Sequence, residues 1–186
     1  NNVGGVVGHN GVYIIVNKVY NTGAVSGASC VGGVVGNNDN INSKRIISQA
    51  YNTGTVSGSD NVGGVAGRNV GTIHNVYNTG MVSGSGYYVG GVAGNNASTD
   101  GIICYTYNTG AVNGNSNVGG VVGDNNWGTV TNSWYATTDA ANHEINRSMN
   151  NIGTGEALSV LQGMKLTDYG FDANYWRTNA ADGSTK

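Results

Sequence analysis

The sequence has no proline, and charged residues make up only 10% of its 186 positions. Because proline is absent and the 33 glycines follow no three-residue period, a collagen-like triple helix is excluded. A formal net charge of -2 leaves no basic stripe that could follow the phosphates of a nucleic acid. No apolar run approaches the ~20 residues of a membrane-spanning helix. We therefore expect neither nucleic-acid binding nor direct membrane insertion.

Cysteine and histidine are also scarce. Cys30 and Cys104 lie at different places in separate repeats of the pattern described below, too far apart for the ~7 Å Cα separation that a disulfide allows. Both are expected to be free thiols. The histidines His9, His74 and His143 show no spacing typical of metal ligands, and the Gly-Gly-x-Gly-x-Asp calcium repeat is absent. The sequence thus predicts no metal and no cofactor.

What the sequence does contain is a glycine-rich hexapeptide, seen most clearly as Val-Gly-Gly-Val-Ala-Gly at Val62–Gly67. It occurs five times, with Val or Ala at its fifth place, starting at Val3, Val31, Val62, Val89 and Val118. A second phrase, Tyr-Asn-Thr-Gly, starts at Tyr20, Tyr51, Tyr77 and Tyr107 and is degraded to Tyr-Ala-Thr-Thr at Tyr135. This recurrence identifies a repeat protein.

The two phrases are separated by one constant interval and one variable interval. From each repeat Tyr to the next Val-Gly-Gly there are 11 or 12 residues, whereas from Val-Gly-Gly to the next Tyr there are 15 to 20. A solenoid whose loops leave from one face shows this pattern. Each repeat offers three strand-like segments, in the third repeat Ile73–Tyr77, Met81–Ser83 and Val89–Ala93. We predict an all-β parallel β-helix of about five coils, with roughly 28 residues and three short strands per coil.

Equivalent residues of successive coils should then stack in columns. The fourth hexapeptide place is always Val and is predicted to face the core: Val6, Val34, Val65, Val92 and Val121. Two places after the hexapeptide comes an unbroken asparagine column, predicted to form an amide ladder: Asn10, Asn38, Asn69, Asn96 and Asn125. The tyrosines Tyr20, Tyr51, Tyr77 and Tyr107 are predicted to stack ring on ring. Because the first hexapeptide place is also Val, we expect the Gly-Gly pair to bend the strand so that both valines face inward.

The repeat pattern ends at Ala136. Further on, Glu156–Lys165 has the apolar spacing of a two-turn helix, with Thr154 as its N-cap. A solenoid end exposes an unpaired edge that must be covered. We therefore divide the chain into solenoid repeats at 1–135 and a C-terminal capping segment at 136–186. The sequence begins inside a repeat, without an initiator Met or a signal peptide, so we expect it to be a piece of a longer protein.

No catalytic group is evident in the pattern. His74 and Cys104 both lie three residues before a repeat Tyr, so stacking would bring a base next to a nucleophile. The same column is expected to hold Asn17, Ser48 and Asn132, however, which indicates a ladder of small polar residues. The loop carboxylates Asp39, Asp60, Asp100 and Asp124 form no cluster of the kind that a carbohydrate-cleaving β-helix needs. We expect a protein that is not an enzyme and has no catalytic residues.

The paired phrases Tyr77-Asn-Thr-Gly-Met-Val-Ser-Gly and Val89-Gly-Gly-Val-Ala-Gly resemble the GLUG motif. That repeat occurs in large bacterial surface exoproteins similar to filamentous haemagglutinin, and in non-catalytic parts of some surface peptidases. The resemblance covers residues 1 to 135, although this chain has Val where the family usually has Leu at the fourth hexapeptide place. It implies a right-handed parallel β-helix, secretion to the bacterial cell surface, and adhesion.

The sequence is therefore interpreted as a fragment of a secreted bacterial adhesin, a rigid spacer that presents a face for cell adhesion to a host glycan or protein. Tyr87 and Tyr88 interrupt a turn that is polar in other repeats and are the candidate contact residues. The alternative is the accessory repeat region of a surface peptidase or of a β-helix carbohydrate-active enzyme. An ice-binding solenoid is a further alternative, but one Thr per coil is fewer than that function needs.

Overall fold

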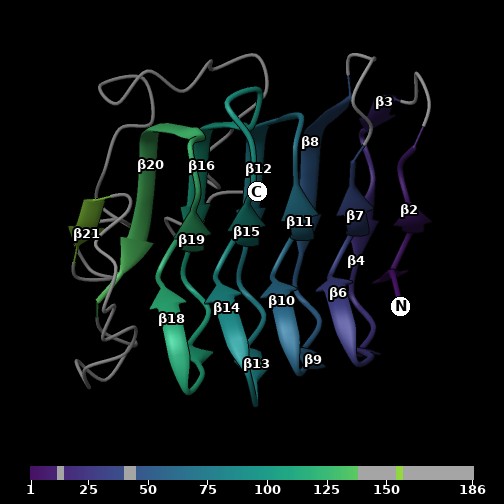
Figure 1. Cartoon of the computed structure of the whole chain (residues 1–186), viewed down its shortest axis with the longest axis vertical. Coiled ribbons are helices and arrows are strands. Elements are labelled where there is room, and N and C mark those ends of the chain that lie inside the picture. Colours follow the sequence, from purple (N-terminus) through teal and green to yellow (C-terminus); the bar gives the residue numbers. More distant parts are fainter. Residues whose placement is uncertain (12–14, 40–44, 138–153, 157–186) are drawn as a thin grey trace, which may run out of the picture.

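The computed structural model describes residues 1–11, 15–39, 45–137 and 154–156. Within these ranges the chain is all β and winds into a parallel β-solenoid of about four turns, with its coils side by side (Figure 1). None of the described residues belongs to a helix long and apolar enough to span a membrane. The predicted parallel β-helix is confirmed, while its right-handed winding and the division of the chain after residue 135 stay predictions.

Four parallel sheets run along the solenoid. Sheet A contains β1 (Val3–Gly4), β6 (Ser29–Gly32), β10 (Asp60–Gly63), β14 (Tyr87–Gly90) and β18 (Ser116–Gly119). Sheet B contains β2 (Val7–His9), β7 (Val35–Asn38), β11 (Ala66–Asn69), β15 (Ala93–Asn96) and β19 (Val122–Asn125). Sheet C contains β3 (Ile15–Asn17), β4 (Tyr20–Asn21), β8 (Ile46–Asn52), β12 (Thr72–Asn78), β16 (Ile102–Asn108), β20 (Thr129–Ala136) and β21 (Thr154–Glu156). Sheet D contains β5 (Val25–Ser26), β9 (Val56–Gly58), β13 (Val82–Gly84) and β17 (Val112–Asn113).

The strand register confirms that equivalent residues stack. Val31 pairs with Val62, and Tyr51 pairs with Tyr77. The prediction of three strands per coil is wrong, because each hexapeptide supplies two strands, one to sheet A and one to sheet B. A complete coil therefore has four strands, and the five hexapeptides span about four turns rather than five.

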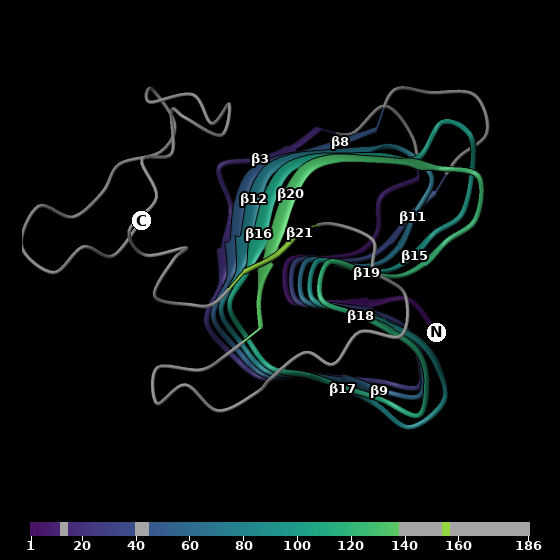
Figure 2. The same ribbon diagram turned by 90° about the vertical axis from the view of Figure 1, so that its left-hand side faces the viewer.

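Sheets A and B form a narrow arch whose closed end points toward sheet C (Figure 2). In the second coil β6 ends at Gly32 and β7 begins at Val35, so the chain reverses between these two residues. A Cβ atom at Gly33 would overlap the carbonyl oxygen of Gly64 and the side-chain amide of Asn52. Only glycine fits where backbones approach this closely. The predicted bend at the Gly-Gly pair is confirmed.

The arch divides the interior into two clusters of buried side chains. Between sheets A and D lies the valine cluster, which consists of Val25, Val31, Val56, Val62, Val82, Val89, Val112 and Val118. Between sheets B and C lies the mixed cluster of Val, Ile and Ala, which includes Val16, Val34, Val35, Ile47, Ala50, Val65, Ala66, Ile73, Val76, Val92, Ala93, Ile103, Val121, Val122 and Tyr135. The first and fourth hexapeptide valines thus both face inward, as predicted, but into different clusters.

The column of fourth-place valines is buried except in the first coil. Val34, Val65, Val92 and Val121 are fully buried. Val6 is 43% exposed, because the first coil has a neighbouring coil on one side only. The prediction that Val6 is a core residue is therefore wrong in this structure. Val6 has the same side chain as the buried members of the column, and it is exposed because it lies in the first coil.

Two columns consist of non-glycine residues with a left-handed backbone. In sheet A they directly precede the first hexapeptide valine and have φ between 49° and 64°: Cys30, Asn61, Tyr88 and Asn117. Along sheet C, with Lys18 lying between β3 and β4, they have φ between 45° and 56°: Lys18, Gln49, Asn75, Tyr105 and Asn132. This conformation is uncommon for residues other than Gly and Asn. Its recurrence at the same place in each coil keeps the coils superimposable.

The last coil departs from the predicted alignment. The register pairs Tyr107 with Trp134 and Asn108 with Tyr135, so Trp134 and not Tyr135 continues the tyrosine column. Tyr135 takes the inward place instead, where its ring lies against Gly120 at the closed end of the arch. Matching one tyrosine to another in sequence thus placed this coil one residue out of register.

A strand from the C-terminal segment extends sheet C. β21 pairs in parallel with β20, and Thr154 lies opposite Trp134. The prediction that Thr154 caps a helix beginning at Glu156 is wrong for these two residues, because both lie in this strand. The rest of the predicted helix and of the capping segment lies outside the described residues.

Candidate binding surface

The predicted asparagine ladder is present inside the corner that follows sheet B. Each side-chain amide nitrogen donates to the side-chain oxygen of the next coil at 2.7 to 2.8 Å, through Asn10, Asn38, Asn69, Asn96 and Asn125. The first four members are fully buried. Because buried polar groups are costly unless they are hydrogen-bonded, this ladder is structural and its amides are not offered to a ligand.

A second asparagine ladder was not predicted by name. It uses the Asn of Tyr-Asn-Thr-Gly and runs through Asn21, Asn52, Asn78 and Asn108, again at 2.7 to 2.8 Å. Each amide also donates to the carbonyl of the phrase's own Gly at 2.7 to 2.8 Å. The invariance of this Asn was the signal that could have revealed the ladder.

The tyrosine column stacks as predicted. The ring centroids of Tyr20, Tyr51, Tyr77 and Tyr107 are separated by 5.1, 4.9 and 5.0 Å, and their planes differ by 7° or less. Exposure falls along the column, from 60% at Tyr20 to 8% at Tyr107. Burial, together with the neighbouring Tyr51, raises the pKa of Tyr77 to about 12.

His74 and Cys104 lie opposite each other in β12 and β16, as the repeat alignment predicts. Burial lowers the pKa of His74 and raises the pKa of Cys104, so both side chains are favoured in their neutral forms. An activated thiolate would need the opposite shifts. The next member of this column is Thr131 and not Asn132, because the last coil is displaced by one residue. Cys104 and Cys30 are both free thiols, as predicted.

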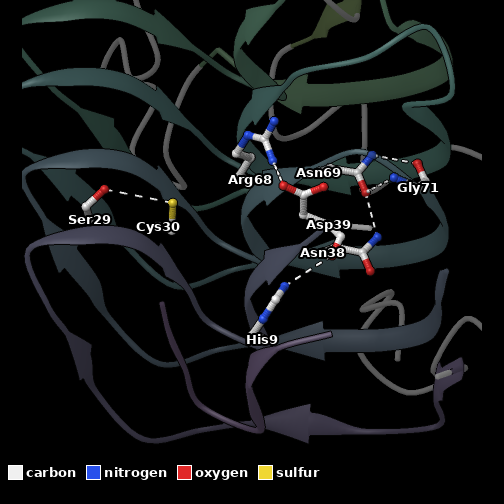
Figure 3. A network of polar contacts seen from close by, with 8 residues as sticks. All are labelled: His9, Ser29, Cys30, Asn38, Asp39, Arg68, Asn69 and Gly71. Carbon is white, nitrogen blue, oxygen red and sulfur yellow. Dashed lines mark hydrogen bonds and ion pairs between the residues drawn. The ribbon is translucent and has the colours of Figure 1, made fainter. Parts of the chain in front are cut away.

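A charged contact joins three coils on the outer side of sheet B (Figure 3). Arg68 donates to the carboxylate of Asp39, and Nε2 of His9 lies 3.1 Å from the backbone oxygen of Asp39. The side chains of Arg68 and Asp39 are each 30% exposed. An ion pair this open to solvent contributes little to stability, and its carboxylate already has a cationic partner.

The four loop carboxylates do not come together. Asp39 is in the ion pair just described, Asp60 accepts a backbone N–H of the next coil, and Asp100 lies exposed in the loop before β16. Asp124 lies in β19, where burial raises the pKa of its carboxyl. In the described ranges, no three His, Cys, Asp or Glu side chains are grouped so that they could hold a metal ion.

An exposed pair of aromatic residues outside the tyrosine column lies at the start of β14. Tyr87 is 60% exposed and Tyr88 is half-buried, with ring centroids 6.1 Å apart and planes 49° to each other. The backbone N–H of Tyr87 donates to Oδ1 of Asp60 in β10 at 2.8 Å. In the next coil, Asn115 donates to the carbonyl of Ser85 at 2.7 Å. We call these five residues the Tyr87 surface.

The Tyr87 surface combines an accessible ring with the exposed residues Ser85 and Asn115 and the half-buried Asp60. A phenol ring offers an apolar face and a hydroxyl tip, while carboxylate, hydroxyl and amide groups around it can donate or accept hydrogen bonds. The contacts of Asp60 and Asn115 with neighbouring coils hold these polar groups in place. This arrangement suits a ligand that is both polar and flat, and it contains no group poised for bond cleavage.

One exposed aromatic was missed by the sequence interpretation. Trp127 is 78% exposed in the turn between β19 and β20, with a φ of 74°. Its turn is one of the variable connections from sheet B to sheet C, which no column predicts. The adjacent Gly128 lies directly against Asn96 and Asn125 of the first ladder, so the turn is anchored while the indole remains outside.

Comparison with known proteins gives a structural match only. No protein-family model matches the sequence, and no curated protein matches it. The chain is similar to the crystal structure of a "putative immunoglobulin A1 protease" from Bacteroides ovatus, with a TM-score of 0.71 and 19% sequence identity. The match covers 95% of this chain and 69% of that one. At this identity the likeness shows a shared β-solenoid fold.

Proposed function

We propose that the chain is a non-enzymatic segment of a secreted or surface-exposed bacterial adhesin. In this role the GLUG-type repeats form a stiff spacer, and the Tyr87 surface presents a binding face to a host glycan or protein. The observation that carries the proposal is the exposed, polar-flanked aromatic pair on an otherwise in-register solenoid. Such a pair has no stabilising role that the other coils share, since Tyr87 lies opposite Ser116 in the next coil.

Two features of the scaffold support a spacer. Both asparagine ladders and the tyrosine column bind each coil to the next through side chains as well as backbone. Repeats connected in this way transmit stiffness along one axis. The low charge of the chain also fits recognition by hydrogen bonds and aromatic stacking, which depend little on ionic strength.

The test is a binding screen of the intact chain against host glycans and matrix proteins. The informative variant carries Tyr87→Ser and Tyr88→Asn, which are the residues found at the equivalent places of the next coil, Ser116 and Asn117. Because these replacements suit the local backbone, the fold should be retained. We expect at least a tenfold loss of affinity, which corresponds to ~1.4 kcal/mol.

The matched control is Tyr105→Asn, because Tyr105 also has a left-handed backbone and its neighbours Asn75 and Asn132 show that Asn suits this place. Tyr105 lies in sheet C, away from the Tyr87 surface. Binding should be unchanged in this variant. Binding that survives the double replacement, or that is lost equally in the control, would remove the assignment to Tyr87 and Tyr88.

The alternative is the accessory repeat region of a surface peptidase. The likeness to the Bacteroides ovatus structure is compatible with it, because that protein is described as a "putative immunoglobulin A1 protease". Immunoglobulin A1 is therefore a specific ligand to include in the screen. Binding without cleavage would support an accessory region, whereas cleavage of immunoglobulin A1 by this chain alone would overturn the non-enzymatic proposal.

A further inference from the structure

The tyrosine column places four phenol rings face to face in successive coils. Parallel strands β4, β8, β12 and β16 hold Tyr20, Tyr51, Tyr77 and Tyr107 in register, and each ring lies 4.9 to 5.1 Å from the next. Strand pairing alone sets this distance, since neighbouring strands lie ~4.8 Å apart. Two phenols are thus kept adjacent for as long as the solenoid is folded.

The two ends of the column differ in their access to solvent. Tyr20 is 60% exposed, whereas Tyr107 is only 8% exposed. One-electron oxidation of a phenol near neutral pH requires that its proton leave at the same time. Burial and the neighbouring Tyr51 raise the pKa of Tyr77 to about 12, so proton loss from this half-buried ring is disfavoured. Within the tyrosine column, an oxidant in solution therefore reaches Tyr20 first and finds Tyr51 stacked against it.

We propose that Tyr20 and Tyr51 form an oxidative cross-linking site, at which a peroxidase with hydrogen peroxide joins the first coil to the second through a dityrosine bond. Each phenol loses one electron and one proton to give a phenoxyl radical. The two radicals couple through ring carbons adjacent to their hydroxyl-bearing carbons, and the ring hydrogens at the new bond then move to the oxygens. In total two hydrogen atoms leave the protein, and one hydrogen peroxide is reduced to two waters.

The edge position of Tyr20 permits the movement that coupling requires. The ring carbons must close from about the 5.1 Å stacking distance to a carbon–carbon bond of about 1.5 Å. Among the described residues β4 pairs with β8 alone, so its two residues can tilt without disturbing a second paired strand. Residues 20 and 51 are 31 positions apart (51 minus 20), so the bond would add a covalent link between two coils that hydrogen bonds and side-chain packing already hold together.

Peptide mapping after trypsin digestion tests the proposal directly. Trypsin cuts after Lys18, Lys44, Arg45 and Arg68, so Tyr20 lies in peptide 19–44 and Tyr51 lies in peptide 46–68. The intact dilute protein is treated with a haem peroxidase and hydrogen peroxide, and the monomer is isolated before digestion. We expect a monomer that is lighter by two hydrogen atoms and a joined pair of peptides 19–44 and 46–68.

Two variants separate this site from other tyrosines. Tyr51→Phe keeps a ring in the stack but cannot form a phenoxyl radical, so the joined peptide pair should disappear while circular dichroism is unchanged. Tyr107→Phe should leave the yield of that pair within twofold of the unmodified protein. The tilted pair Tyr87 and Tyr88 is an internal comparison, because both rings lie within the single tryptic peptide 69–147.

Three results would overturn the proposal. The first is a monomer in which peptide 46–68 is joined mainly to 69–147, since this would place the reaction at Tyr51 and a more buried tyrosine. The second is cross-linking between molecules without any cross-linked monomer. The third is survival of the 19–44 and 46–68 pair in the Tyr51→Phe variant.

Discussion

The valine cluster and the mixed cluster differ in width and in tolerance of length changes. Each full coil gives the valine cluster one Val from sheet A and one from sheet D, and nothing larger. Glycines close the remaining space, since a Cβ at Gly58 would lie 2.9 Å from Cγ2 of Val31 and 3.0 Å from Cγ2 of Val62. The mixed cluster also contains Ile side chains and connects to the loops of variable length.

This difference explains the two intervals in the sequence. The interval of 11 or 12 residues encloses the valine cluster, where one valine from sheet A packs against one from sheet D in each full coil and so limits the length of the connection. Within the variable interval of 15 to 20 residues, the chain leaves the mixed cluster after the first asparagine ladder and returns to it at sheet C. Insertions are accepted where the chain turns in solvent, and they are disfavoured where two strands face each other across a single pair of valines.

The boundary between the two clusters should be the part of the molecule where a substitution lowers stability most. Gly64 lies at the closed end of the arch, where an added Cβ would overlap the carbonyl oxygen of Gly91 and the side chain of Asn78. Gly64→Ala should therefore destabilise the fold by on the order of 4 kcal/mol or more, because the Gly91 backbone cannot move away and the Asn78 side chain is held in the second ladder. Urea denaturation followed by circular dichroism measures this loss.

Gly23→Ala is the control for Gly64→Ala. The nearest atom to an added Cβ at Gly23 is Oδ1 of Asn21, at 3.7 Å. The unfolding free energy should change by no more than ~0.5 kcal/mol. Equal effects of the two replacements would show that the closed end of the arch is not the rigid boundary described here.

The second ladder should give the next largest effect. Asn78 donates to Asn108 at 2.8 Å and to the carbonyl of Gly80 at 2.7 Å, and it accepts from Asn52 at 2.8 Å. Asn78→Ala leaves these buried groups without their partner and should cost about 3 kcal/mol, since each unsatisfied buried group costs ~1–3 kcal/mol. Asn21→Ala, at the half-buried end of the ladder, should cost less than half as much. Similar losses at both places would contradict the burial argument.

The two clusters should respond differently to a single methylene. Val62→Ile adds one methylene group to the valine cluster. It should destabilise the protein by ~1–3 kcal/mol, because the neighbouring glycines leave no space for the added group. Ile73→Val removes one from the mixed cluster and should cost ~0.5–1.5 kcal/mol. The comparison is made from the urea midpoints of both variants. A stabilising Val62→Ile would show that the valine cluster has unfilled volume.

Repetition let the sequence predict the columns but not how they divide the interior. Val31 and Val34 were both expected to be buried, and both are. Their residue type alone did not show that they belong to separate clusters. The hexapeptide was interpreted as one bent strand because its length suits a single strand. The arch depends on glycine–backbone contacts between coils, and these are non-local.

The candidate site was predictable only where a residue broke a column. Tyr87 stood out because other coils have polar residues at its place, and it is exposed. Its partner Asp60 belongs to another coil and carried no signal of its own. Trp134 and Tyr135 show the reverse case, since matching residue types moved the last coil by one position where side-chain packing decides the register.

Removing a buried hydroxyl from the mixed cluster should raise the free energy of unfolding slightly, whereas the replacements above lower it. Thr106 is fully buried and inward-facing, and its Oγ1 has no hydrogen-bond partner among the described residues. Val76 occupies the same place in the preceding coil, so the site accepts a valine. Thr106→Val should stabilise the protein by ~1 kcal/mol, because an unpaired buried hydroxyl is replaced by a methyl of similar size.

The control is Thr79→Val, at an exposed place, which should change stability by less than ~0.5 kcal/mol. A destabilised Thr106→Val would mean that the hydroxyl is satisfied in solution and that the mixed cluster is less apolar than the valine cluster.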